Sequence, residues 1–155
     1  MNLNWWGARG KRRGNARGIK TRSGKLTCMK KILIADDDEA TRKLVGIHLK
    51  QMLGEKGIEA EIHEAVSKKD LLQKFLEHKP DLAIIDNDME DRNDGVNAIK
   101  ELRAMGHETP VYLHTSRDRD FIEKTGLKFD KNTGHLHKAK NMSESLHEIV
   151  ERHLR

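Results

Sequence analysis

Short apolar segments alternate with longer amphipathic segments five times along most of the chain, and this alternation constrains the fold more than any other feature. Segments 31–35 and 81–85 lack polar alternation, which is typical of strands buried on both faces. Segment 58–65 alternates and is typical of an edge strand, while 111–115 and a segment ending near Lys138 complete the five. Strands that alternate with helices predict an α/β fold, with a five-stranded parallel sheet covered by helices on both faces.

The amphipathic segments carry the spacing and the end signals of helices. Apolar residues within 44–53 recur at helical spacing, and this stripe ends near Gly54. Ser67, followed three residues later by Asp70, resembles a capping box, and Pro80 ends that helix. Asp38 is predicted to cap the helix that follows the first strand. Further helices are predicted after Gly95, over residues 117–124, and from Ser143 onward.

Composition excludes several classes of protein. Of the 155 residues, 35% are charged and 35% are apolar, which suits one domain with a modest core. No run approaches the ~18 uninterrupted apolar residues of a membrane span, and the start of the chain lacks the apolar run of a secretory signal. The single cysteine, Cys28, excludes an internal disulfide framework and a multi-cysteine zinc site. We therefore expect a cytoplasmic protein in a reducing compartment.

Residues 1–28 differ in composition from the rest of the chain. They contain eight Lys or Arg residues, no acidic residue and five of the twelve glycines, and they show neither helical nor strand periodicity. Residues 29–155 hold the other 22 basic residues and all 25 acidic ones, which is a net charge of −3. We therefore predict a disordered basic tail at 1–28 in front of a faintly acidic domain at 29–155.

The tail has two interpretations. Its basic side chains, with Trp5 and Trp6 available for stacking, favour binding to nucleic acid or to an anionic surface. Alternatively it is an expression appendage or an over-extended start, with Met29 as the initiator directly before the first apolar run. No nucleic-acid binding is expected outside the tail, and no membrane partner is expected.

Polar side chains follow the predicted strands at the point where each strand ends. The first predicted strand ends at Asp36–Asp38, and the third ends at Asp86. The fourth ends at Thr115, and the fifth ends at Lys138. In an open parallel sheet, ligands collect outside the carboxyl ends of the strands, where the strand order reverses. If the strand order is 2-1-3-4-5, the first and third strands flank that point. The acidic side chains of those two strands are then expected to face each other.

Crowded carboxylates have a defined chemistry. They repel one another and resist joint ionisation unless a cation lies among them. Oxygen ligands suit a hard ion such as Mg²⁺, or Mn²⁺ in its place. A carboxylate beside that ion can attack phosphorus and form an aspartyl phosphate. Lys138 would offset the added negative charge, and Thr115 would donate a hydrogen bond to a phosphoryl oxygen.

These motifs resemble the receiver domain of two-component response regulators, over residues 30–155. They read ILIADDD, DLAIID, PVYLHTS and HLHK, and each one ends a predicted strand. The resemblance implies a flavodoxin-like, doubly wound fold with the strand order 2-1-3-4-5. It implies a single-domain phospho-acceptor rather than an enzyme with turnover. The expected donor is a phosphohistidine on a sensor histidine kinase or a histidine phosphotransfer protein, and the output is a phosphorelay or an unknown downstream protein.

The resemblance also implies roles for individual residues. Asp86 would be the phosphorylated side chain, and Thr115 and Lys138 would contact the phosphoryl group. Asp37 and Asp86 would bind the metal ion directly through their carboxylates, and Asp36 would bind it through a water molecule. Asp88 would contribute its backbone carbonyl oxygen.

The chain departs from the family pattern away from these residues. Glu90 replaces the proline that usually follows the phosphorylated aspartate, Ala139 replaces a second proline, and His135 replaces an aromatic residue. These changes predict an atypical output face around the fourth and fifth helices. Separately, we hypothesise that Asp88 and Arg117 pair across the phosphorylation pocket and hinder attack of water on the acyl phosphate.

Other functions fit parts of the sequence. The Asp86–Asp88 spacing also matches a phosphatase that uses an Asp-x-Asp pair as nucleophile and acid, although there the pair follows the first strand. A flavin-binding module of the same topology would need a phosphate-binding loop after the first strand. Here that position holds the acidic residues 36–39, which would repel a phosphate. A transition-metal site at His114, His135 and His137 is a further alternative, and sheet-surface or partly buried imidazoles are the simpler interpretation.

Overall fold

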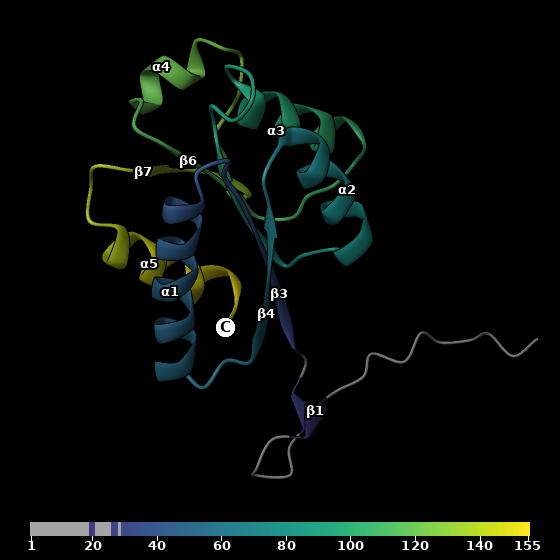
Figure 1. The fold of residues 1–155 in the computed structure, drawn as a ribbon, viewed down its shortest axis with the longest axis vertical. Helices are drawn as coiled ribbons and strands as arrows, with labels where there is room; N and C mark the ends of the chain where they lie inside the picture. Colours follow the sequence, from purple (N-terminus) through teal and green to yellow (C-terminus); the bar gives the residue numbers. More distant parts are fainter. Residues whose placement is uncertain (1–18, 21–25, 28) are drawn as a thin grey trace, which may run out of the picture.

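The computed structural model describes residues 19–20, 26–27 and 29–155. A five-stranded sheet forms its centre, and helices follow the strands along the chain (Figure 1). The strands of this sheet are β3 (Lys30–Ala35), β4 (Ala60–Ala65), β5 (Leu82–Asp86), β6 (Val111–Thr115) and β7 (Thr133–His137). The helices are α1 (Glu39–Glu55), α2 (Lys68–His78), α3 (Asp94–Ala104), α4 (Arg119–Glu123) and α5 (Met142–His153).

The topology confirms the predicted fold. Every strand pair in the sheet is parallel, and the order is β4-β3-β5-β6-β7. Numbered along the chain, these five strands have the order 2-1-3-4-5, which is that of a flavodoxin-like fold. The alternating segment forms β4 at the edge of the sheet, as its pattern predicted. The uninterrupted apolar runs form β3 and β5, which lie inside the sheet.

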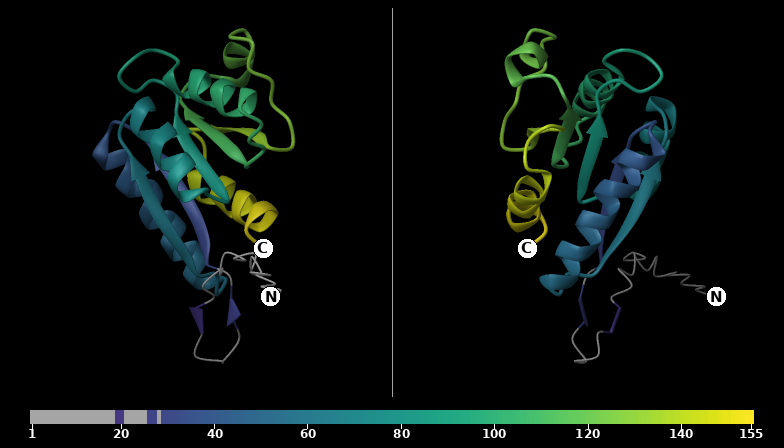
Figure 2. Two further views of the ribbon diagram at one scale, coloured as in Figure 1. Left: turned by 90° about the vertical axis from the view of Figure 1, so that its right-hand side faces the viewer. Right: turned by 60° about the vertical axis from the view of Figure 1, so that its left-hand side comes forward.

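The two faces of the sheet bury separate apolar cores. Residues of α1 and α5 pack on one face, and residues of α2, α3 and α4 pack on the other. Figures 1 and 2 show this arrangement, with the sheet between the two layers of helices. Each long helix therefore buries one apolar stripe, and its exposed face is mostly polar apart from Leu44 and Ile47 on α1 and Leu76 on α2. In the part of the chain that the structure describes, no helix has both the length and the apolar character to cross a membrane.

Capping residues set several helix boundaries as predicted. The Asp38 side chain caps α1 by accepting a hydrogen bond from the Thr41 amide at 3.0 Å. The Ser67 hydroxyl caps α2 in the same way, accepting from the Asp70 amide at 3.1 Å, and the Asp70 carboxylate accepts from the Val66 amide. These bonds satisfy amides that the first turn of a helix leaves free.

Several boundaries differ from the sequence-based expectation. β4 begins at Ala60 rather than at Ile58, because the Ile58 amide donates to the Leu53 carbonyl oxygen and closes the end of α1. α4 covers only 119–123 instead of 117–124, since the Arg117 amide bonds to a threonine side chain before the helix starts. α5 begins at Met142 instead of at Ser143, one residue early.

The predicted disordered tail lies largely outside the described residues. Within 1–28 the structure describes only β1 (Ile19–Lys20) and β2 (Leu26–Thr27), which pair as a short antiparallel ladder. The division into a tail at 1–28 and a domain at 29–155 therefore stays a prediction.

A partly buried arginine, Arg103, bonds to the segments that lead into β6 and β7, at the end of the sheet where the strands begin. The Arg103 guanidinium donates to the carbonyl oxygens of His107, Thr109 and Asn132 at 2.7–2.9 Å. It also donates to the Thr133 hydroxyl at 2.9 Å. One side chain thus joins the end of α3 to the segments entering β6 and β7, far from the strands' carboxyl ends.

Candidate functional site

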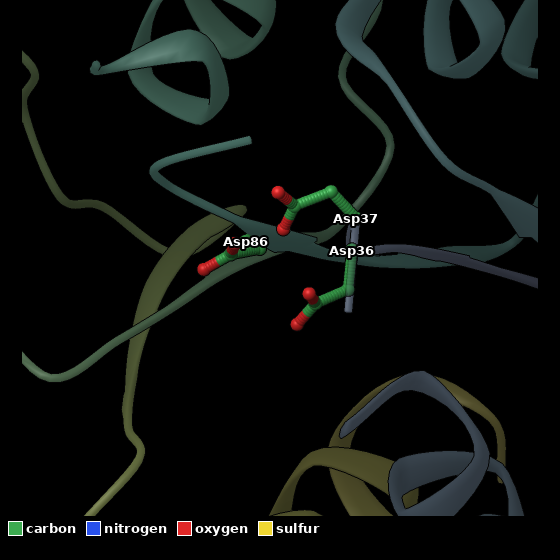
Figure 3. Close-up of side chains that lie close together, drawn as sticks. All are labelled: Asp36, Asp37 and Asp86. Carbon is green, nitrogen blue, oxygen red and sulfur yellow. The ribbon is translucent and has the colours of Figure 1, made fainter. Parts of the chain in front are cut away.

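Three carboxylates converge where β3 and β5 end. Asp86 is the last residue of β5, and Asp36 and Asp37 directly follow β3. The two strands are neighbours with Ala35 opposite Ile85, so Asp36 and Asp86 lie at the same level of the sheet. One carboxylate oxygen from each of the three residues lies within 4.8 Å of the others. Figure 3 shows the three side chains turned to the same side of the strand ends.

Lys138 brings a positive charge into this group. It follows β7, and its Nζ lies 2.9 Å from Asp86 Oδ1 and 3.5 Å from Asp36 Oδ2. Thr115 ends β6 next to it and is buried, and its carbonyl oxygen accepts from the Lys138 amide at 2.9 Å. The structure therefore brings Asp36, Asp37, Asp86 and Lys138 together, as the strand-end pattern predicted.

Asp88 is placed differently from the other predicted ligands. Its carboxylate accepts from the Asn93 amide at 2.9 Å and pairs with Arg117 Nε at 3.3 Å. The hypothesised Asp88–Arg117 pair is therefore confirmed as a contact. A role for the Asp88 carbonyl oxygen in metal binding stays a prediction.

Burial controls the protonation of the site. Asp86 is 5% exposed, and burial together with the neighbouring Asp36 raises the pKa of Asp86 to about 6, against the lowering effect of Lys138. Burial likewise raises the pKa of Asp36. The two carboxylates in turn raise the pKa of Lys138, although its own burial works in the opposite direction. The site thus holds more negative charge than its one lysine balances.

The donor set fits a hard divalent cation. Asp36 Oδ2 is buried and has no hydrogen-bond partner, while Lys138 Nζ lies 3.5 Å from it. A buried carboxylate oxygen without a partner is costly unless a cation approaches it. The three residues offer only oxygen atoms, which is the preference of Mg²⁺ and Mn²⁺. The residues present therefore fit the predicted ion.

The backbone after β5 is held by close packing against α3. Asn87 is fully buried, its side-chain oxygen accepts from the Val96 amide at 3.3 Å, and its carbonyl oxygen accepts from the Gly95 amide at 2.8 Å. A Cβ atom on Gly95 would lie 2.3 Å from the Asp86 carbonyl oxygen. Only glycine allows α3 to approach so closely, and this approach positions Asp86.

Sequence reasoning missed Arg42 and Asn87 around the site, and it named His114 only as part of the alternative transition-metal site. Arg42 of α1 and His114 of β6 are buried polar groups, and Asn87 is buried between two acidic residues. For Asn87 the signal was its place directly after an apolar strand and next to Asp86. His114 stands inside an otherwise apolar strand segment, which already indicated an unusual buried group. No local pattern pointed to Arg42.

The histidines near the site do not form a metal-binding group. His135 Nε2 lies 2.8 Å from the Arg117 carbonyl oxygen, and His137 Nε2 lies 3.6 Å from Asp118 Oδ1. Among the described residues, the only group of three or more potential ligands with suitable spacing is Asp36, Asp37 and Asp86. The simpler interpretation, separate imidazoles on the sheet, agrees with these contacts.

Comparisons with known proteins give consistent matches. A family model described as "Response regulator receiver domain" matches residues 32–151. A chemotaxis response regulator of Vibrio cholerae superposes with a TM-score of 0.58 at 25% identity, covering 80% of this chain and 98% of that one. No curated protein sequence matches the chain.

Two further solved structures share the fold. The signal receiver domain of a Mycobacterium tuberculosis response regulator superposes with a TM-score of 0.62 at 20% identity, covering 79% of this chain and 97% of that one. The receiver domain of a Pseudomonas aeruginosa sensor histidine kinase superposes with a TM-score of 0.65 at 15% identity, covering 81% and 98%. That structure holds a magnesium ion in its active-site cleft.

Proposed function

Because the chain belongs to the family of response-regulator receiver domains, we propose that it accepts one phosphoryl group on Asp86 from a phosphohistidine donor. The observation that supports this most directly is the meeting of Asp36, Asp37 and Asp86 at one point, with Lys138 Nζ 2.9 Å from Asp86 Oδ1. Residues 29–155 form the proposed phospho-acceptor unit.

The chemistry follows from the side chains at this point. A carboxylate oxygen of Asp86 attacks phosphorus, the P–N bond of the phosphohistidine breaks, and its electron pair returns to the imidazole nitrogen. Lys138 and the Thr115 hydroxyl then hold the new phosphoryl oxygens by charge-assisted hydrogen bonds. Asp36, Asp37, Asp86 and the Asp88 carbonyl oxygen would hold a Mg²⁺ or Mn²⁺ ion, which when bound neutralises phosphoryl charge.

The partners follow from the family. Receiver domains exchange phosphoryl groups with histidine kinases or phosphotransfer proteins, and the Pseudomonas relative is itself part of a sensor histidine kinase. We expect the same class of donor for this chain, in the cytoplasm, and a downstream protein that recognises the phosphorylated form. The magnesium ion of that relative supports Mg²⁺ as the cofactor here.

A small acyl-phosphate donor tests the proposal. With Mg²⁺ present, intact-mass measurement should show the gain of one phosphoryl group, and peptide mapping should place it on Asp86. Removal of the divalent ion with a chelator should prevent the gain. Labelling at another residue, or labelling that ignores the chelator, would contradict the proposal.

The same experiment separates the alternative functions. A phosphatase would consume the donor continuously without a stable mass gain. A flavin-binding module would be yellow after purification and would ignore the donor. Binding of nucleic acid through residues 1–28 would show as steep salt dependence and would leave labelling unchanged.

Arg117 is expected to slow the loss of the phosphoryl group. Its Nε lies 3.3 Å from Asp88 Oδ2, two residues after Asp86, and its guanidinium stacks over the Phe121 ring at 4.6 Å. We propose that Arg117, held by these contacts, hinders the approach of water to the phosphorylated Asp86. Arg117→Ala should speed dephosphorylation by up to about fivefold, the range of an exposed ion pair. The rate is measured by following the phosphorylated mass after the donor is removed.

Arg119 provides a matched control. It also stacks on an aromatic ring, that of Phe129 at 4.8 Å, but it pairs with Glu123 instead of with the loop that follows Asp86. Arg119→Ala should leave the dephosphorylation rate unchanged. Equal rates for the Arg117→Ala protein and the unmodified protein would remove the shielding role.

A further inference from the structure

We propose that Arg42 is a positioning residue for Asp36 and Asp37 and thereby sets the affinity of the site for Mg²⁺. The inference rests on the proposed function, because it concerns the ion that the acidic side chains would hold. Arg42 lies near the start of α1, and only 8% of it is exposed.

The key contact holds one particular peptide unit. Arg42 Nη1 donates a buried hydrogen bond to the Asp36 carbonyl oxygen at 2.8 Å. That oxygen belongs to the peptide group that joins Asp36 to Asp37. Its orientation determines how the two carboxylates are directed relative to each other, so Arg42 acts on both candidate ligands through a single bond.

The other hydrogen bonds of residues 36–38, which join β3 to α1, hold different parts of this segment. The Asp36 amide bonds to the Ala65 carbonyl oxygen at 3.1 Å, and the Asp36 carboxylate accepts from the Asp38 amide at 2.9 Å. The Asp38 side chain caps α1. The first bond fixes the backbone at Asp36, the second fixes the Asp36 side chain, and the third fixes the backbone where α1 begins. The Arg42 bond is the one in this set that fixes the peptide between the two acids.

Among the described residues, the charge of Arg42 pairs with Glu64 and not with the carboxylates that would hold the ion. Its Nε lies 3.6 Å from Glu64 Oε2 on β4, and this Nε is buried without a hydrogen-bond partner. The guanidinium therefore interacts with a carbonyl oxygen and with Glu64, while Lys138 contacts Asp36 and Asp86. Arg42 can orient the ligands without competing for the oxygen atoms that a cation needs. Groups that orient metal ligands typically change affinity by about 10–100-fold when they are lost.

Titration calorimetry with Mg²⁺ tests the proposal on the full chain. Arg42→Met keeps the buried stem but removes the donor, and it should weaken Mg²⁺ binding about 10–100-fold. Arg42→Lys keeps the charge without the planar fork and should weaken binding less. Labelling by the acyl-phosphate donor should return to the unmodified rate when Mg²⁺ is raised to saturation, because the reactive Asp86 is intact.

Arg103→Met is the matched control, because Arg103 makes the same kind of carbonyl bonds at the opposite end of the sheet. It should lower stability in chemical unfolding while leaving Mg²⁺ affinity within about twofold. Equal weakening by both variants would show that affinity only follows global stability and would overturn the proposal.

The remaining outcomes are also decisive. Unchanged affinity in a folded Arg42→Met protein would overturn this inference alone, whereas an unmodified protein that binds no Mg²⁺ would overturn the proposed function as well. If Arg42→Met does not fold, Arg42→Lys and Glu64→Gln replace it. Unchanged affinity in both of these would overturn the proposal.

Discussion

Asp86→Asn is expected to abolish phosphoryl acceptance and, at neutral pH without divalent ions, to stabilise the fold by about 2 kcal/mol. For a chain of this size the gain corresponds to a rise in melting temperature of about 4–8 °C. Both effects have one cause. The carboxylate that reacts with phosphorus is also a buried charge close to Asp36 and Asp37.

The sign follows from the pKa of Asp86. Burial first, and then the charge of Asp36, raise this pKa from 3.8 to about 6 in the folded protein. The folded state therefore holds the proton more tightly than the unfolded state. The associated stability is complete below pH 3.8 and is lost as the pH rises through about 6. At neutral pH the ionised carboxylate is a net cost, which a neutral amide of the same shape removes.

Chemical unfolding at neutral pH, followed by circular dichroism, measures this gain. Asp88→Asn is the control, since the Asp88 side chain is 42% exposed and should change stability by no more than about 0.5 kcal/mol. Addition of Mg²⁺ should stabilise the unmodified protein and should do so much less for Asp86→Asn. A destabilised Asp86→Asn protein would mean that the pairing of Asp86 with Lys138 outweighs its burial.

Acidification is expected to destabilise the Asp86→Asn protein by about 3 kcal/mol through His114 alone. His114 lies on β6 opposite Asp86, is 2% exposed, and its Nε2 has no hydrogen-bond partner. Burial, and to a smaller extent the charge of Lys138, lower the pKa of His114 from 6.5 to about 4. The unfolded chain therefore takes up a proton that the folded protein resists, and stability falls as the pH drops from 6.5 to about 4.

In the unmodified protein the two groups oppose each other. Protonation of Asp86 adds stability over nearly the same pH range in which protonation of His114 removes it. The effect of His114 is therefore the difference between Asp86→Asn and the double variant Asp86→Asn/His114→Leu, in unfolding experiments at several pH values. Parallel pH profiles for these two proteins would show that His114 does not titrate as its burial requires.

The apolar pattern of the sequence was a reliable guide wherever the structure depends on local periodicity. Segments 31–35 and 81–85 predicted buried strands, and Ser67 predicted the start of a helix, because burial and capping act within a few residues. The errors concern ends such as Ile58, whose amide closes a helix instead of entering a strand. A pattern of apolar residues does not record which of two partners a single amide bonds to.

For the site, too, some features follow from the sequence and others only from the tertiary structure. By itself the sequence determined that acidic residues stand at the carboxyl ends of two strands, and that these strands belong to a parallel sheet. It also determined that Lys138 stands at the carboxyl end of the last strand. Chain order and side-chain alternation are enough to place residues at strand ends. Only the tertiary structure decided that Arg42 reaches the peptide between Asp36 and Asp37, and that His114 is buried beside Asp86. Those contacts depend on strand register, on the distance between packed layers and on side-chain conformation, and none of these is written in the spacing of residues along one chain.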